Sequence, residues 1–88
     1  MKEREFERVL KALANKRRLA IISLLKKKYE ASVGEIAENI KLSIKATSKH
    51  LNLMLSADIL DKEQRSLQMY YSISTSCPKL ARLIINLL

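Results

Sequence analysis

The chain has 88 residues, 17 of them Lys or Arg against 9 Asp or Glu, which gives a formal net charge of +8 at pH 7. A chain of this length makes one small domain, 1–88, and buries only about 60% of its unfolded surface, so it gains stability from a partner subunit. The charge favours a polyanionic partner, either nucleic acid or an anionic membrane surface. The single cysteine excludes an internal disulfide, and no apolar run approaches the roughly 20 residues that span a bilayer.

Two amphipathic helices are predicted in the first third of the chain. The first covers residues 3–14, where apolar side chains recur at helical spacing, and the second covers 16–28 after Asn15, a favoured N-cap residue. The second helix ends in three lysines, Lys26 to Lys28, which complement the negative end of a helix. Contact with phosphate is the alternative role for these lysines. The residues expected in its buried stripe are Leu19, Ile22 and Leu25, with Ile21 and Leu24 beside them.

A helix-turn-helix is predicted over about residues 33–57. Ser32 and Glu35 have the spacing of a capping box, so a short helix is expected to start between them. After a short turn, Ser43 is the expected N-cap of a second helix at 44–57. Its apolar stripe is expected at Ile44, Thr47, Leu51 and Met54. Its opposite face is basic and polar, as in the recognition helix that a helix-turn-helix places in the major groove of DNA.

A small wing is predicted directly after this helix, at about residues 59–73. Short alternation of apolar and polar side chains indicates two strands, Ile59 to Glu63 and Leu67 to Ile73. Every second residue from Leu67 onward is expected on one face of the second strand. The hairpin tip is expected at Gln64 to Ser66. The segment from Tyr29 to Ala31 is expected to be only an extended connector.

A last helix is predicted at about residues 78–88, with Pro78 in its first turn and Ser76 or Cys77 as its cap. It is too apolar for a lone surface helix, and an exposed apolar patch of this kind usually marks a partner surface. An isologous interface between two copies is therefore expected from the two end helices. Its predicted residues are Phe6, Val9, Leu80, Leu83, Ile84 and Leu87.

Four stretches of the chain together resemble the ArsR/SmtB family of bacterial and archaeal winged-helix repressors. Leu10 to Leu25 is similar to the family pattern "LkaLadptRlrILrlL", and Ser32 to Ala37 to "sVgELa". Ser48 to Met54 resembles "SrHLkvL", and Tyr70 to Ile73 resembles "yYrL". The resemblance implies a mainly α fold with a small β-hairpin, a winged helix-turn-helix. It also implies a homodimer joined through its first and last helices, bound to an inverted-repeat operator and released by an inducer.

The chain departs from the metal-sensing members of that family. The family's Cys-x-Cys pair at the start of the third helix is replaced by Ala31 to Glu35, which contains no thiol. The last helix has no Asp, Glu or His, and the whole chain has one Cys and one His. Because a tight zinc-type site needs several thiolate or imidazole ligands, no metal and no cofactor are expected, and the unknown inducer is not expected to be a metal. Gln64 and Ser66 stand at the tip where the family has Arg and Gly, and Asp58 replaces the family's helix-ending Gly, a position that often needs positive φ.

The predicted DNA contacts lie on the second helix of the helix-turn-helix and on the wing. They are Lys41, Ser43, Lys45, Ala46, Ser48, Lys49, His50, Asn52 and Arg65. Lys45 and Lys49 are one turn apart and are expected to contact phosphates or bases, although paired lysines often lie only on a solvated face. His50 is open between a phosphate contact, a position at the edge of the core and a metal ligand. Asn52 is open between a bidentate contact with adenine and a contact with the DNA backbone only, because it lies two turns into the helix. Arg65 is expected to contact a phosphate.

The favoured function is a sequence-specific DNA-binding transcriptional regulator, expected to be a repressor in a prokaryotic cytoplasm at the nucleoid. An enzyme is not expected, because the sequence shows no Ser-His-Asp set, no paired carboxylates and no phosphate-binding glycine loop. Two alternatives stay open. One is a winged-helix protein-interaction module, favoured by Leu53 and Leu55 beside the basic face. The other is a non-specific nucleic-acid-binding protein, favoured because no arginine lies on the predicted recognition helix, and Arg to guanine is the commonest specific contact.

Overall fold

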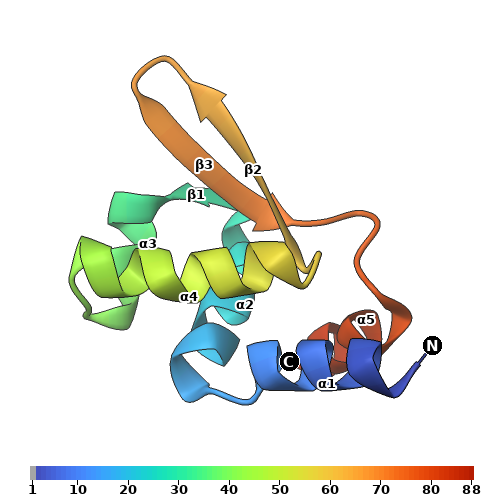
Figure 1. Ribbon diagram of the computed structural model, residues 1–88. Helices are drawn as coiled ribbons and strands as arrows, with labels where there is room; N and C mark the ends of the chain where they lie inside the picture. The colour runs from blue at the N-terminus through green and yellow to red at the C-terminus, as the bar shows by residue number, and fades with distance from the viewer. Residues whose placement is uncertain (1) are drawn as a thin grey trace.

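The computed structural model describes residues 2–88 as five helices and a three-stranded antiparallel sheet (Figure 1). The hairpin forms a wing that projects beyond α4, while α1 and α5 lie side by side at the other end of the molecule. The elements are α1 (Glu3–Leu13), α2 (Lys16–Lys28), β1 (Glu30–Ser32), α3 (Val33–Ile40), α4 (Ile44–Ser56), β2 (Leu60–Arg65), β3 (Gln68–Ile73) and α5 (Lys79–Leu87). This order is that of a winged helix-turn-helix, as predicted.

The starts of the three central helices are set by local hydrogen bonds. The Asn15 side chain accepts from two backbone N–H groups at the start of α2, at 2.9 and 3.2 Å. Ser32 and Glu35 form both hydrogen bonds of the capping box on α3. The hydroxyl oxygen of Ser43 accepts from the backbone N–H of Ala46 at 3.1 Å. Each bond satisfies a backbone donor that has no partner within the helix, and the three predicted caps are confirmed.

The sheet contains a strand that the sequence did not predict. β1 pairs with β3 through Ala31 and Tyr71, where only a connector was expected. The hairpin tip is also shifted, because Arg65 pairs with Gln68 and the turn lies at 66–67. Leu67, expected on a strand face, stands at this turn with 95% of its surface exposed. The prediction of a tip at 64–66 is therefore wrong, since Gln64 and Arg65 belong to β2 and only Ser66 lies in the turn.

The buried core differs at several residues from the core that the sequence predicts. Val9 is only 2% exposed, so it packs inside its own protomer and is not an interface residue. Ile44, expected on the buried stripe of α4, is 56% exposed, whereas the other three residues of that stripe are fully buried. In α2, Ile21 is fully buried and Leu19 only partly. The fully buried side chains of the core include Ile21, Ile22, Leu25, Ile36, Leu51, Met54, Ile59, Leu60 and Ile85.

Two loop residues lie next to helix ends, Asp58 after α4 and Pro78 before α5. Asp58 adopts φ 60°, so the left-handed conformation expected at the end of the recognition helix is present, and a short Asp side chain tolerates it. Before α5, Pro78 is the N-cap residue and not part of the first turn. No side chain caps α5, so the predicted Ser76 or Cys77 cap is wrong.

Candidate nucleic-acid interface

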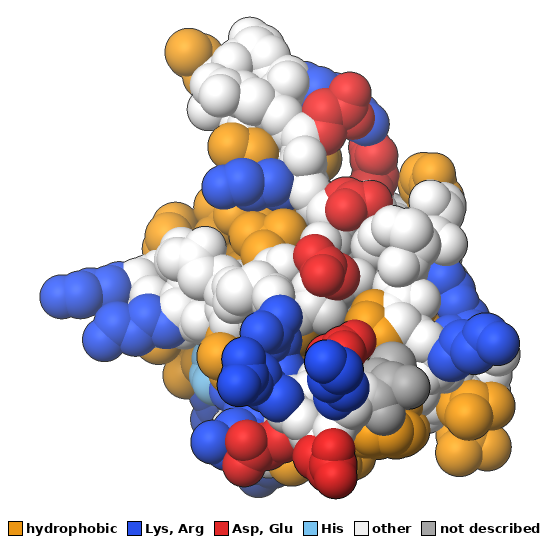
Figure 2. All heavy atoms as spheres, turned by 45° about the vertical axis from the view of Figure 1, so that its right-hand side comes forward, with side chains coloured by type: hydrophobic (Ala, Val, Ile, Leu, Met, Phe, Trp, Pro, Cys, Tyr) orange, Lys and Arg blue, Asp and Glu red, His pale blue; other side chains and the backbone are white. Residues whose placement is uncertain are grey.

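α4 is held with one polar face outward. Thr47, Leu51 and Met54 are fully buried and anchor its inner side. The Thr47 hydroxyl is buried without a hydrogen-bond partner in residues 2–88, so this residue serves packing. Lys45 and Lys49 are exposed one turn apart on the other side. Figure 2 shows Lys and Arg side chains standing out at the left of the molecule, as expected for a surface that attracts a polyanion.

The remaining predicted contacts of the helix-turn-helix surround these lysines. Lys41 is exposed in the turn before α4 with φ 58°, and Ser43 is exposed at the helix start. The Ser43 oxygen accepts the capping bond, which leaves its hydroxyl proton available to donate to an anion at the helix N-terminus. Further along α4, Asn52 is exposed, whereas Ala46 and Ser48 are half-buried.

His50 lies at the edge of the core and is tied to α2. Its Nδ1 is 3.1 Å from Nη1 of Arg18. Because a guanidinium can only donate, Nδ1 accepts this hydrogen bond and the ring proton of neutral His50 lies on Nε2. Partial burial, followed by the charges of Arg18 and Arg17, holds the pKa of His50 below its usual value of 6.5. His50 is therefore neutral at pH 7 and has an N–H left to donate from a half-buried position.

Arg65 is already occupied by carboxylates. Its Nη2 donates to Glu30 at 2.7 Å and to Glu63 at 2.8 Å, and its guanidinium lies 5.0 Å from the ring centroid of Tyr70. These two acids raise the pKa of Arg65, and the hydrogen bond from Arg65 lowers the pKa of Glu30. The wing strands carry Asp61 and Glu63 against Lys62 and Arg65, so the wing has no surplus of positive charge. A phosphate contact by Arg65 would require it to exchange at least one carboxylate.

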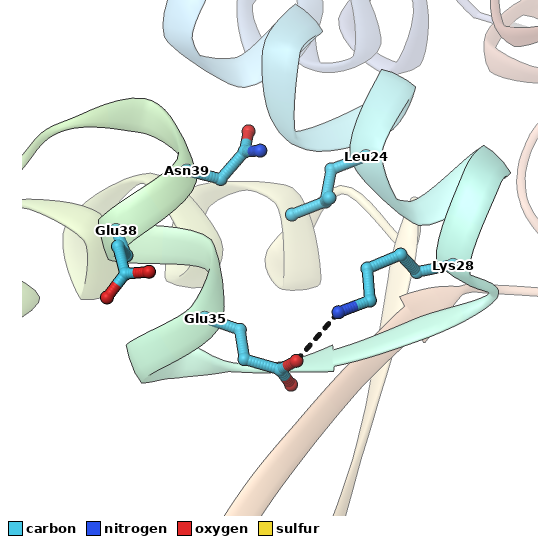
Figure 3. Close-up of a pocket in the computed structure, with 5 residues that line it drawn as sticks. All are labelled: Leu24, Lys28, Glu35, Glu38 and Asn39. Atoms are coloured by element: carbon cyan, nitrogen blue, oxygen red, sulfur yellow. Dashed lines mark hydrogen bonds and ion pairs between the residues drawn. The ribbon is translucent and has the colours of Figure 1, made fainter.

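Two of the three lysines at the end of α2 have structural partners. Lys26 Nζ donates to the backbone oxygens of Ile85 and Leu88 at 2.8 and 2.7 Å, which caps the end of α5. Lys28 points toward Glu35 and donates to it at 2.8 Å across a hollow of about 270 Å³ between α2 and α3 (Figure 3). Leu24, Glu38 and Asn39 complete the lining of this hollow. These contacts favour the structural role of the triplet over phosphate contact.

Glu35 takes part in two interactions at once. The hydrogen bond from Lys28, with that from the backbone N–H of Ser32, holds the pKa of Glu35 at about 2. It therefore stays ionised and locks the start of α3, the first helix of the helix-turn-helix. The hollow of Figure 3 is a polar crevice crossed by the ion pair of Lys28 and Glu35.

An exposed apolar surface lies on α1 and α5, the two helices that lie side by side at the end of the molecule away from the wing (Figure 1). Leu83 is 65% exposed and Leu87 86% exposed, which is unusual for leucine. Phe6 and Leu10 are exposed on the neighbouring α1, while Leu80 and Ile84 are partly buried against the core. Leu10 takes the place that the sequence assigned to Val9. Helical spacing alone places both on one stripe, and the packing of α1 on the core buries Val9 while Leu10 stays exposed.

Neither a metal site nor a membrane span emerges from residues 2–88. In that stretch no three His, Cys, Asp or Glu side chains gather where they could hold a metal ion. Cys77 is half-buried against the core and forms no disulfide. None of the helices in residues 2–88 combines the length and the hydropathy needed to cross a bilayer.

The chain is similar in sequence to transcriptional regulators. Residues 15–62 match the family model described as bacterial regulatory protein, arsR family. The chain is 32% identical over 68 residues to the transcriptional repressor SdpR of Bacillus subtilis (strain 168), covering 77% of this chain and 74% of that protein. It is 34% identical over 68 residues to the transcriptional activator HlyU of Vibrio cholerae, covering 77% of this chain and 62% of that protein.

Solved structures resemble the whole architecture. HlyU from Vibrio cholerae superposes with a TM-score of 0.82 at 29% identity, over 99% of this chain and 92% of that one. The homodimeric winged helix-turn-helix DNA-binding domain of Mb0332 from Mycobacterium bovis has a TM-score of 0.81 at 27% identity, over 99% of this chain and 82% of that one. With the matched family model and the geometry of α4, these likenesses identify the chain: it belongs to the ArsR family of bacterial regulatory proteins and is a DNA-binding transcriptional regulator.

Proposed function

We propose that this regulator is a repressor that binds an inverted-repeat operator as a homodimer, through α4 and the wing, at the nucleoid of a bacterial cytoplasm. The observation that carries the proposal is the polar face of α4, with Lys45 and Lys49 exposed on a capped helix whose other side is buried. Repression is supported by the similarity to SdpR, which is a repressor, although HlyU is an activator.

The proposed contacts divide into positioning and base recognition. Lys41, Lys45 and Lys49 bind phosphates or bases as flexible point charges. Asn52 is exposed on α4 and has the amide pair that recognises adenine. The hydroxyls of Ser43 and Ser48 and the Nε2–H of His50 donate to the DNA backbone, and Ala46 lets that backbone approach closely. Arg65 contributes less, because a phosphate must compete with Glu30 and Glu63 for it.

The proposed homodimer buries the apolar surface of α1 and α5. Phe6, Leu10, Leu83 and Leu87 are exposed on two adjacent helices, where a second copy would cover them. The Mb0332 domain, similar in fold, is homodimeric. These four side chains belong to α1 and α5, so the proposed interface uses none of the α4 side chains that are proposed to contact DNA.

A binding titration tests the proposal. An inverted repeat from the DNA flanking the gene is compared with its scrambled form and with heparin, by electrophoretic mobility shift. Tight binding to the repeat alone supports the proposal, and equal binding to all three probes indicates a non-specific nucleic-acid-binding protein. The double variant Lys45→Ala/Lys49→Ala should lose operator binding, whereas Lys27→Ala, which removes an exposed lysine on α2, should retain it. If the folded, dimeric double variant binds as the wild type does, α4 is not the DNA-binding helix.

A protein-interaction module is the second candidate, because apolar side chains are exposed near the basic face. Ile44 and Leu53 on α4 and Leu67 at the wing tip are all exposed. A helix that contacts only DNA normally carries polar groups there. This candidate predicts that Leu53→Ser leaves operator binding intact and weakens capture of a partner protein, whereas a DNA-binding α4 predicts no captured partner.

A further inference from the structure

Arg18 at the start of α2 joins two helices that have different proposed tasks. Its Nε donates to the backbone oxygen of Ala12 at 2.6 Å, and its Nη2 donates to that of Lys11 at 2.7 Å. Both oxygens belong to the last turn of α1. The remaining nitrogen, Nη1, donates to Nδ1 of His50 on α4 at 3.1 Å. One guanidinium thus uses all three of its nitrogens to hold the end of α1 against the middle of α4.

The chemistry of this contact makes it geometrically strict. The carbonyls at the end of α1 have no partner within the helix and form the negative end of its dipole, so a cation is favoured there. A guanidinium is planar and rigid, and its fork fixes the direction of each bond, which a lysine ammonium does not. Burial lowers the pKa of Arg18. An arginine starts from so high a pKa that the guanidinium stays charged all the same. Arg18 therefore adds a directional polar link between α1 and α4, which also pack on each other and share the apolar core.

We propose that Arg18 is a positioning residue that fixes the recognition helix relative to the dimerisation helix and so sets the spacing of DNA half-sites that the dimer accepts. The proposal rests on the proposed function, in which α1 lies in the dimer interface and α4 binds DNA. In a two-fold dimer each α4 reaches its half-site from the shared axis, so its orientation on α1 determines how far apart the two copies lie. If α4 were held less firmly on α1, the dimer would bind operators with neighbouring half-site spacings almost equally well.

His50 is the acceptor that completes this link. It accepts from Arg18 only while neutral, because both ring nitrogens of a protonated histidine are donors. The charges that lower its pKa are those of Arg18 and Arg17, both on α2. Both are cations, so protonation of His50 brings like charges together and removes the hydrogen bond from Arg18. The preference for one spacing should therefore weaken as the pH falls through the folded pKa of His50, which lies below the usual 6.5.

The test measures spacing preference and not affinity alone. An inverted repeat selected from a pool of random duplexes is compared with versions whose centre is lengthened or shortened by one base pair. The readout is the ratio of dissociation constants between the preferred and altered spacings. Arg18→Gln should reduce that ratio by about fivefold or more, within the usual range of coupling between sites. Arg17→Gln removes the same charge from the adjacent residue, whose side chain makes no hydrogen bond within residues 2–88, and should keep the wild-type ratio.

Variants at His50 separate positioning from general stability. His50→Asn keeps an acceptor near the place of Nδ1 and should preserve the spacing ratio, whereas His50→Leu should lower it as Arg18→Gln does. The double variant Arg18→Gln/His50→Leu should be no worse than either single one, because they break the same link. Arg18→Lys, which keeps the charge without the fork, provides a folded comparison if Arg18→Gln unfolds. It should lower the ratio as well.

Two results would overturn the inference. In the first, the wild type binds the selected repeat but shows no preference among spacings. In the second, dimeric Arg18→Lys and His50→Leu lower the melting temperature yet keep the wild-type ratio, which would make the contact purely stabilising. Failure of the proposed function looks different, because then the wild type selects no inverted repeat at all.

Discussion

At the scale of single residues, Arg65 shows that a cation's neighbours decide what it can bind. It is the one basic residue at the expected wing tip, and a phosphate contact is a natural expectation from the sequence. In the structure it holds Glu30, which lies 35 residues away in the chain, and Glu63 on its own strand. A cation that is already matched by two acids releases few counterions from DNA when it approaches.

Arg65→Ala is therefore predicted to weaken operator binding less than Lys49→Ala does. Removing Arg65 leaves two uncompensated carboxylates near the DNA, and so the double variant Arg65→Ala/Glu30→Gln should recover part of that loss. Operator dissociation constants measured at three salt concentrations will check this. A larger loss for Arg65→Ala than for Lys49→Ala would mean that Arg65 leaves its carboxylates and binds phosphate directly.

Which residues the sequence could place depends on how local their environment is. The caps at Asn15, Ser32 and Ser43 involve bonds within three residues, and the sequence predicted all of them. The partners of Arg18 and Arg65 lie 32 and 35 residues away, so no spacing rule could find them. No signal in a single sequence identifies such a contact in advance, because it depends on how the helices pack.

At the scale of elements, the helices were predictable and the sheet only partly so. Helical periodicity extends over eight to thirteen residues in α1 to α4, which is long enough to detect a buried stripe. β1 has three residues, too few to display alternation, and it exists because β3 offers it a partner. The hairpin strands lie within two residues of their predicted starts and ends.

α3 gives a prediction about pH at this scale. Glu35 has a pKa of about 2 instead of 4.5, since Lys28 and the Ser32 backbone donate to its ionised form. A group with a lowered folded pKa contributes stability above its unfolded pKa and loses it as the pH falls through the folded one. The melting temperature should therefore decrease between pH 4.5 and pH 2.

The Glu35→Gln variant should have a lower melting temperature than the wild type at pH 7. Its melting temperature should also fall less than that of the wild type between pH 4.5 and pH 2. Circular dichroism melts at half-unit pH steps will measure both effects. Glu38→Gln is the matched control, since Glu38 lines the same hollow and no side-chain ion pair is present for it in residues 2–88. Parallel melting curves for Glu35→Gln and the wild type would show that the capping box contributes no pH-dependent stability.

At the scale of the whole molecule, two surfaces with different chemistry lie on different helices. The apolar surface of α1 and α5 is suited to a second copy, and the basic surface of α4 to DNA. Leu83→Glu/Leu87→Glu should place like charges across the two-fold axis and give a folded monomer or an aggregate in sedimentation velocity. Leu67→Glu, at the wing tip, changes a leucine that is even more exposed, and this variant should remain dimeric. An intact dimer in the double variant would place the interface elsewhere.

Metal ions are predicted to leave this molecule unchanged. One Cys and one His in the whole chain cannot supply the ligands of a tight zinc-type site. Equimolar Zn(II), Cd(II) or As(III) should therefore alter neither the melting temperature nor operator affinity. A stoichiometric metal that reverses DNA binding would reveal ligands that the sequence does not suggest.

DNA binding by the whole dimer should depend strongly on salt. The two copies of α4 are expected to lie about one DNA turn apart, roughly 34–36 Å, in successive major grooves. With lysine contacts from α4 and the preceding turn in each subunit, roughly 6–10 phosphates are neutralised, and the log–log slope of affinity against salt should be about −5 to −9. Lys45→Ala and Lys49→Ala should each make the slope shallower by about 2 per dimer, because each removes one phosphate contact from both subunits. If both slopes stay at the wild-type value, these lysines contact bases or solvent, and phosphate binding lies on another face.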